Sequence, residues 1–161
     1  MLRLYTDGSY SDLTGIGSWA WLLVGANGHE VGSGAVGAGA THQRMELTAA
    51  VEGLAAVPEG SAVVVISDSS YVVEPMSRRY PERWRERGWS SLGHSRQIVH
   101  RDLWERLVEL AGRRRVRFAW VRAHSGAAGD PWNEMADHLA KTARRLGEAE
   151  EVEPGPLCHA G

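Results

Sequence analysis

Apolar and polar residues alternate with a period of two at the start of the chain. The alternation covers residues 2–7 and breaks at Gly8, and residues 17–24 form a second apolar run of strand length. Residues 30–38, loosened by glycines, form a third run, after an Asn-Gly turn signal within residues 25–28. Runs with this period and these breaks are typical of β-strands joined by hairpins. The first part of the chain therefore predicts an antiparallel meander of three strands.

The spacing of apolar residues then becomes helical. From Leu47 to Leu54 apolar residues recur every three or four positions, and the stripe ends before Pro58, with Thr41 as a candidate N-cap. This pattern predicts a helix. Further along the chain, strands and helices alternate, which favours parallel pairing of the later strands. The pattern as a whole predicts an α/β fold, with one mixed sheet flanked by helices.

Two apolar runs supply the later strands of this sheet, at residues 62–66 and 116–121. Helical spacing begins near residues 71, 99 and 131. With 161 residues, 43% hydrophobic and 24% charged, the chain is long enough for one domain with a substantial core. The pattern contains no internal repeat and no second domain.

The composition of the chain bears on the cellular compartment in which the protein is expected to function. No apolar run approaches the roughly 18 residues of a membrane span, and no secretory leader precedes the first strand. The single cysteine, Cys158, excludes an intramolecular disulfide and a zinc cage built from cysteines. We therefore expect a cytoplasmic protein without a membrane partner.

The net charge of −2 argues against a nucleic-acid-binding protein, but the charges are unevenly distributed along the chain. Residues 78–122 carry thirteen arginines against five acidic residues, and they lie between two acidic segments. Their first half, up to residue 100, shows no regular period. A solvated, salt-bridged helical surface is one reading of such a segment. All thirteen basic residues of this segment are arginines, and Trp84, Trp89 and Trp104 lie among them. This composition favours a phosphate-binding face.

Four acidic residues recur in two kinds of setting. Asp7 and Asp68 each end an apolar strand, whereas Glu46 and Asp137 each lie beside the apolar stripe of a helix. Taken alone, Asp7 reads as a turn residue that caps backbone amides. If the first and fourth strands are parallel neighbours, however, Asp7 and Asp68 emerge together at the carboxyl edge of the sheet, where α/β folds bind ligands.

Clustered carboxylates repel one another, and no lysine or arginine within these motifs is placed to neutralise all four. Oxygen ligands of this kind favour hard divalent cations such as Mg²⁺. Two such ions would stabilise both the attacking and the leaving oxygen of a phosphoryl displacement. His124 follows the last strand in a loop with serine and glycines. It is either a loop residue bonded to backbone or, beside a metal centre, an imidazole that protonates a leaving group.

Five motifs stand out in the sequence, at residues 6–9, 44–50, 67–72, 102–104, and His124 followed by 133–137. In this order and at these spacings they resemble type 1 ribonuclease H of the bacterial type. They extend nearly to residue 143, and each would be a weak signal alone, whereas together they are highly specific. The segment 83–89 resembles the basic protrusion of that family.

The resemblance implies a five-stranded mixed sheet, three strands antiparallel and then two parallel, within a catalytic domain of residues 1–146. Residues 147–161 would form an acidic, disordered tail. The implied activity is endonucleolytic hydrolysis of the RNA strand of RNA–DNA hybrids, which leaves 5′-phosphate and 3′-hydroxyl ends. The cofactor would be Mg²⁺, two ions with substrate bound, with Mn²⁺ as a substitute. The partner would be the hybrid, acted on by a monomer without an obligate protein partner.

The resemblance also assigns residues. The acids Asp7, Glu46, Asp68 and Asp137 match the metal ligands, with Asp7 bridging both ions, and His124 completes the catalytic set. Positions near the RNA strand are Gly8, Ser9, Gln43, Arg44 and Ser70. Positions on the side that grips DNA are Trp84, Arg85 and Trp104.

Three departures from the family pattern concern recognition. Residues 13–15 replace an Asn-Pro-Gly, Gln43 replaces an asparagine, and Ser70 replaces a glutamine. Because the 2′-hydroxyl distinguishes RNA from DNA, affinity and cleavage preference are expected to differ. Two alternatives stay open: a related metal-dependent nuclease acting on DNA, told apart by cleavage of duplex or branched DNA, and a non-catalytic hybrid-binding module, told apart by binding without turnover.

Overall fold

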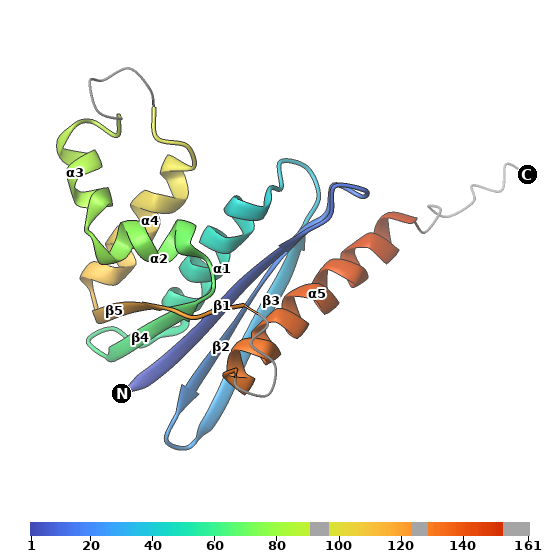
Figure 1. Ribbon diagram of the computed structural model, residues 1–161, viewed down its shortest axis with the longest axis horizontal. Coiled ribbons are helices and arrows are strands. Elements are labelled where there is room, and N and C mark those ends of the chain that lie inside the picture. The colour runs from blue at the N-terminus through green and yellow to red at the C-terminus, as the bar shows by residue number, and fades with distance from the viewer. Residues whose placement is uncertain (91–96, 124–128, 153–161) are drawn as a thin grey trace, which may run out of the picture.

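The computed structural model describes residues 1–90, 97–123 and 129–152, and the elements follow one another as strands, then alternating helices and strands (Figure 1). Their bounds are β1 Leu2–Tyr10, β2 Gly17–Gly25, β3 Gly28–Val36, α1 His42–Ala56, β4 Ala62–Ser67, α2 Ser70–Ser77, α3 Tyr80–Glu86, α4 Arg101–Gly112, β5 Arg115–Trp120 and α5 Pro131–Val152.

The five strands form one sheet in the order β3-β2-β1-β4-β5. The meander β1–β2–β3 is antiparallel, β4 pairs parallel to β1, and β5 pairs parallel to β4. The predicted five-stranded mixed sheet is confirmed. None of the helices in the described ranges is long and apolar enough to cross a membrane.

Two hydrophobic clusters hold the helices on opposite faces of this sheet. One contains Leu4 of β1 with residues of α1 and α4, and the other contains Tyr5 of β1 with Ala136 of α5. Because successive side chains of a strand point to opposite faces, β1 contributes to both clusters. Full burial of a side chain the size of Leu4 contributes about 2 kcal/mol.

Local signals explain where α1 begins and ends. The Oγ1 of Thr41 accepts a hydrogen bond from the backbone N of Arg44 at 3.1 Å, as an N-cap does. The helix ends at Ala56 because Val57, which precedes Pro58, has extended backbone, the conformation that a following proline favours. This start places Glu46 in the second turn of α1.

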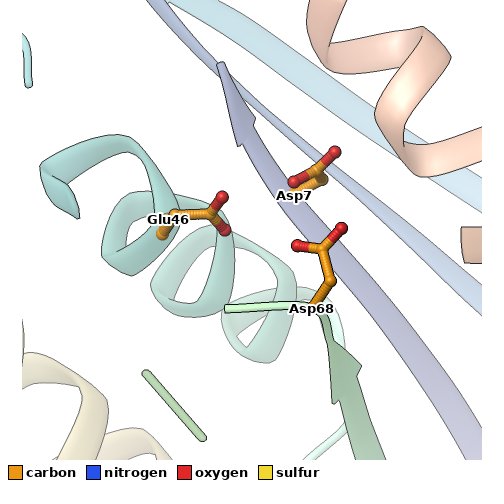
Figure 2. A group of neighbouring side chains, drawn as sticks. All are labelled: Asp7, Glu46 and Asp68. Atoms are coloured by element: carbon orange, nitrogen blue, oxygen red, sulfur yellow. The ribbon is translucent and has the colours of Figure 1, made fainter. Parts of the chain in front are cut away.

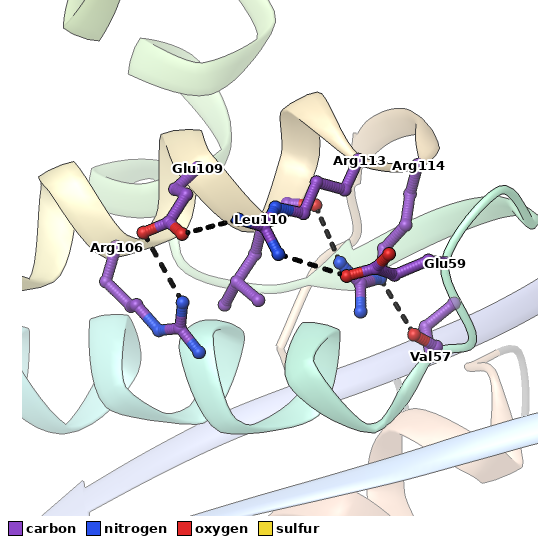
Figure 3. Close-up of polar contacts among 7 residues, drawn as sticks. All are labelled: Val57, Glu59, Arg106, Glu109, Leu110, Arg113 and Arg114. Atoms are coloured by element: carbon purple, nitrogen blue, oxygen red, sulfur yellow. Dashed lines mark hydrogen bonds and ion pairs between the residues drawn. The ribbon is translucent and has the colours of Figure 1, made fainter.

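Part of the arginine-rich segment joins α4 to the connection between α1 and β4 (Figure 3). Arg113 contacts Glu109 at 3.1 Å and Glu59 at 3.2 Å, while Arg114 donates to the backbone oxygens of Val57 at 2.8 Å and Leu110 at 2.9 Å. The salt-bridged reading of the basic segment is therefore correct for this end of α4. Exposed pairs of this kind each contribute about 0–1 kcal/mol.

Two expectations about secondary structure are wrong. Residues 80–86, expected to be irregular, form the short helix α3, which begins after Arg79 in the left-handed region at φ 59°. Residues 147–152, expected to belong to the tail, continue α5. Tertiary packing helps to explain the second difference, because Thr14 of the turn after β1 contacts Glu148, and the i, i+4 pair of Arg144 and Glu148 supports the helix locally. The rest of the expected tail lies outside the described residues.

Candidate active site

Three carboxylates converge at the carboxyl end of the two central parallel strands (Figure 2). Asp7 lies on β1, Glu46 on α1 and Asp68 directly after β4, and one oxygen of each lies within 4.8 Å of the others. The pairing of Tyr5 with Ile66 explains why Asp7 and Asp68 emerge side by side, since each comes two residues later. The structure thus brings together three of the four predicted metal ligands.

Gly8 allows α1 to approach β1 closely enough for Glu46 to reach this cluster. A Cβ at Gly8 would lie 2.5 Å from the backbone N of Glu46 and 2.6 Å from the carbonyl carbon of Met45. Real Cβ atoms do not come so near to backbone, so only glycine fits here. The backbone N of Gly8 also donates to Oδ1 of Asp7 at 3.0 Å. Gly8 therefore has a packing function, and its contact with RNA remains a prediction.

Burial and mutual repulsion raise the pKa values of Asp7 and Glu46. The pKa of Asp7 rises to about 8, chiefly because of burial, then because of the negative charge of Asp68 and a hydrogen bond to Asp137. Burial, followed by the charge of Asp7, raises the pKa of Glu46 well above its ordinary value. Without a cation, Asp7 and Glu46 therefore bind protons more readily than carboxylates in water.

The donor set fits a hard divalent cation. The Oε2 of Glu46 is buried and has no hydrogen-bond partner within the described ranges. A buried polar atom of this kind is costly unless something binds it. Three carboxylates supply only oxygen ligands, as Mg²⁺ requires. We conclude that Asp7, Glu46 and Asp68 are suited to hold such an ion.

Asp137 adjoins the cluster from the other face of the sheet. It lies on α5 and accepts a hydrogen bond from protonated Asp7, which is one cause of the raised pKa of Asp7. Its Oδ2 also lies 3.0 Å from Nζ of Lys141, and its side chain is 22% exposed. The fourth predicted acid is therefore next to Asp7, on the side away from Glu46.

Two neighbours of the acids were not predicted. Lys141 lies beside Asp137, and Nε2 of His42 lies 3.3 Å from Oε1 of Glu46. Both pairs have the i, i+4 spacing, which brings side chains together on a helix. That spacing was the available signal in the sequence. Each acid on a helix thus has a nitrogen-bearing side chain one turn away.

The last residue of β5 supplies one further contact near the acids. The Nε1 of Trp120, at the end of β5, donates to the backbone oxygen of Asp68 at 3.0 Å. This bond ties the start of the loop to the residue that carries the carboxylate. His124 itself lies outside the described residues, and its catalytic role stays a prediction.

The side expected to grip DNA is only partly at the surface. Arg85 is exposed and Trp84 is partly buried, but Trp104 is 1% exposed. The rings of Trp84 and Trp104 meet edge to face with centroids 5.3 Å apart. Direct DNA contact by Trp104 is therefore wrong for this structure, because the ring lies in the core and supports Trp84 from beneath.

The positions expected near the RNA strand also differ among themselves. Gln43 and Ser70 are exposed. Arg44 forms a bidentate ion pair with Asp102 of α4, at 2.6 and 3.2 Å, and also lies 3.2 Å from Nδ1 of His100. Arg44 therefore links α1 to α4 before any substrate binds, and its contact with RNA stays a prediction.

The raised pKa of Asp7 predicts how stability depends on pH when no metal is present. The folded chain keeps the proton up to about pH 8, whereas the unfolded chain releases it near the ordinary pKa of 3.8. Stability from this group is therefore complete below about pH 4 and is lost as the pH rises to 8. We expect the free energy of unfolding in EDTA to fall by up to about 1.4 kcal/mol per pH unit over this range.

Urea unfolding of wild type and Asp7→Asn at several pH values measures this slope. The difference between the two proteins removes the contribution of other groups, including Asp102, whose pKa is lowered by Arg44. A slope that Asp7→Asn leaves unchanged would show that Asp7 does not hold the proton. Added Mg²⁺ should stabilise the wild type more at pH 8 than at pH 6, because it competes with protons.

Comparison with known proteins finds one family model and several relatives that carry the same family name. The family model described as RNase H matches residues 1–145. Proteins named Ribonuclease H from Chlorobium phaeovibrioides and Thermus thermophilus are each 38% identical, over 89% and 96% of this chain and 95% and 89% of their own sequences. One from Acidithiobacillus ferrooxidans is 42% identical over 86% of this chain and 84% of its own length.

Solved structures agree with this result. LC9-RNase H1, described as a type 1 RNase H with the type 2 active-site motif, superposes with a TM-score of 0.74 and 26% identity, covering 96% of this chain and 81% of its own. The N-terminal RNase H domain of rv2228c from Mycobacterium tuberculosis, at 21% identity and a TM-score of 0.70, covers 94% and 98% and supports the fold alone. The chain belongs to the RNase H family of endoribonucleases and is of the bacterial type.

Proposed function

We propose that this protein is an endonuclease that hydrolyses the RNA strand of RNA–DNA hybrids and leaves 5′-phosphate and 3′-hydroxyl ends. The observation that carries the proposal is the cluster of Asp7, Glu46 and Asp68 in a chain of the RNase H family. The buried, unpartnered oxygen of Glu46 and the raised pKa of Asp7 support a cation at this place. Mg²⁺ is the proposed ion, and Mn²⁺ is a substitute.

The position of Asp7 suits a bridging ligand. It has Glu46 and Asp68 on one side and Asp137 on the other. Two divalent cations held by these four residues would activate the attacking water and stabilise the departing 3′ oxygen. No nucleophilic side chain is needed. We assign to His124 the transfer of a proton to the leaving group, a role that suits an imidazole in a loop beside the site.

The hybrid would bind with its RNA strand at the acidic cluster of Asp7, Glu46 and Asp68 and its DNA strand on a neighbouring surface. The exposed Arg85, with Trp84 beside it, supplies charge and an aromatic surface for the DNA strand. Ser9, Gln43 and Ser70 flank the acids on the RNA side, where contacts to the 2′-hydroxyl select the strand to be cut. We propose that the enzyme acts as a monomer in the cytoplasm and needs no obligate protein partner.

A cleavage assay tests the proposal. A labelled RNA–DNA hybrid, duplex RNA, duplex DNA and a branched DNA are each incubated with the protein in Mg²⁺, Mn²⁺ or EDTA. We expect metal-dependent cleavage of the RNA in the hybrid alone, with 5′-phosphate products. Cleavage of DNA would indicate a related nuclease of different substrate, and tight hybrid binding without turnover in either metal would indicate a binding module.

A further inference from the structure

Beyond Asp137, α5 has a second pair of charged residues, Arg144 and Glu148, and Arg144 contacts the carboxyl end of β1. The Nε of Arg144 donates to Oγ of Ser9 at 2.9 Å, and its Nη1 donates to Oε1 of Glu148, also at 2.9 Å. Arg144 lies two turns after Asp137, so both face the same side of the helix. Ser9 in turn lies two residues after Asp7 on β1 and on the same face. Arg144 therefore stands beside the metal site.

Glu148 extends this contact to the turn between β1 and β2. Its Oε1 also accepts a hydrogen bond from Oγ1 of Thr14 at 3.1 Å, and Oγ1 of Thr14 accepts one from the backbone N of Ile16 at 3.3 Å. The turn itself closes through two backbone bonds, from the N of Gly15 to the O of Ser11 and from the N of Ser11 to the O of Ile16. The segment in which this chain departs from the family pattern is thus held by α5.

The bond from Arg144 determines what Ser9 can offer to a ligand. A guanidinium has donors only, so Oγ of Ser9 accepts and its own proton points elsewhere. Among the residues that the structure describes, no acceptor receives that proton. The side chains of Arg144 and Glu148 are only 20% and 23% exposed, which strengthens charge-assisted hydrogen bonds relative to water. Ser9 is therefore presented as a hydrogen-bond donor beside the acids.

We propose that Arg144 is a positioning residue for substrate. It orients the hydroxyl of Ser9 to donate to an oxygen of the RNA strand next to the cleaved bond, either a ribose 2′-oxygen or a phosphate oxygen. The contacts of Glu148 with Arg144 and Thr14 stabilise the fold and are not part of this positioning. The inference rests on the proposed function, because it needs an RNA strand at the metal site.

The test compares four variants in steady-state cleavage of a hybrid: Arg144→Met, Ser9→Ala, the double variant and Arg145→Met. Arg145 is the exposed neighbour on α5, so its variant removes the same charge without touching Ser9. We expect Arg144→Met and Ser9→Ala each to raise KM about tenfold, with kcat changed less than threefold. The double variant should be no worse than Ser9→Ala, because both remove one contact.

Modified substrates identify the acceptor. Hybrids with one 2′-deoxy residue or one methylphosphonate near the cleaved bond remove either the 2′-oxygen or the phosphate charge. The modification that removes the true acceptor should abolish the difference between wild type and Arg144→Met, and the other should leave it intact. If the tenfold difference between wild type and Arg144→Met persists with both modified hybrids, Ser9 contacts neither oxygen and the inference fails.

Glu148→Gln separates positioning from simple stabilisation. This variant removes the ion pair with Arg144 and keeps an oxygen for Thr14, so we expect lower thermal stability with KM within threefold of wild type. If KM instead rises in proportion to lost stability in every variant, Arg144 is only a structural contact. Additive effects, or equal effects of Arg144→Met and Arg145→Met, also overturn the inference. Wild type that does not cleave the hybrid overturns the proposed function and this inference together.

Discussion

Replacement of Asp7 with asparagine is expected to lower hydrolysis of the RNA strand by about a thousandfold or more. The carboxylate of Asp7 has acids on both sides, so its loss removes the ligand shared by both proposed ion positions. The measurement is the rate of hybrid cleavage at saturating Mg²⁺. Glu52→Gln is the matched control, because Glu52 is an exposed carboxylate on α1, the helix that carries Glu46.

The same variant should fold and should resist urea better than wild type at pH 7.5 in EDTA, by about 1–2 kcal/mol. The neutral amide removes a buried charge, which near pH 8 the wild type must either carry or neutralise with a proton. Loss of activity with gain of stability would separate a chemical role from a structural one. Mg²⁺-dependent cleavage by Asp7→Asn at near the wild-type rate would instead remove Asp7 from the site.

Gly8→Ala is expected to destabilise the protein by about 3 kcal/mol, the upper part of the range for overpacked positions. The added methyl would lie 2.5 Å from the backbone of Glu46, and backbone in the middle of a helix cannot move aside as a side chain can. To relieve the clash, α1 must shift away from β1, which carries Glu46 away from Asp7. We therefore also expect weaker Mg²⁺ binding, measured by calorimetry on the folded variant.

Gly112→Ala is the matched control for this change. Gly112 lies in α4, and a Cβ there would meet no atom within 4 Å. Alanine in a helix is more favourable than glycine, by up to about 1 kcal/mol. We expect Gly112→Ala to be neutral or stabilising in urea unfolding. Equal stability of the two alanine variants would mean that Gly8 is not the closest point between strand and helix.

The sheet could be predicted from the sequence because each strand has its own period and its own breaks. Two of the four acids, Asp7 and Asp68, could be placed together because parallel strands end at one edge of a sheet, whatever the side chains around them. Glu46 could be placed on its helix, but the depth at which α1 lies against β1 depends on Gly8. That depth follows from three-dimensional packing, and the sequence pattern does not encode it locally.

The surface residues were harder to predict for a related reason. The arrangement of Trp84, Trp89 and Trp104 among arginines predicts an exposed nucleic-acid face, yet Trp89 and Trp104 are in the core and Trp84 is partly exposed. Burial is set by which helices meet, here α3 on α4. Likewise the last turns of α5 look like an acidic tail until Thr14 and Arg144 are seen beside Glu148. Contacts 134 residues apart in sequence leave no periodic signal.

The ion pair between Arg44 and Asp102 joins α1 to α4. Arg44 lies two residues before Glu46 on α1, and Asp102 lies two residues before the Trp104 that supports Trp84. This bond, together with the hydrophobic cluster shared by α1 and α4, joins the helix that carries Glu46 to the helix that supports Trp84. Under the proposed function, a duplex whose two backbones are spaced differently would not reach the acids and Trp84 at once. Helical form would then contribute to substrate selection together with the 2′-hydroxyl.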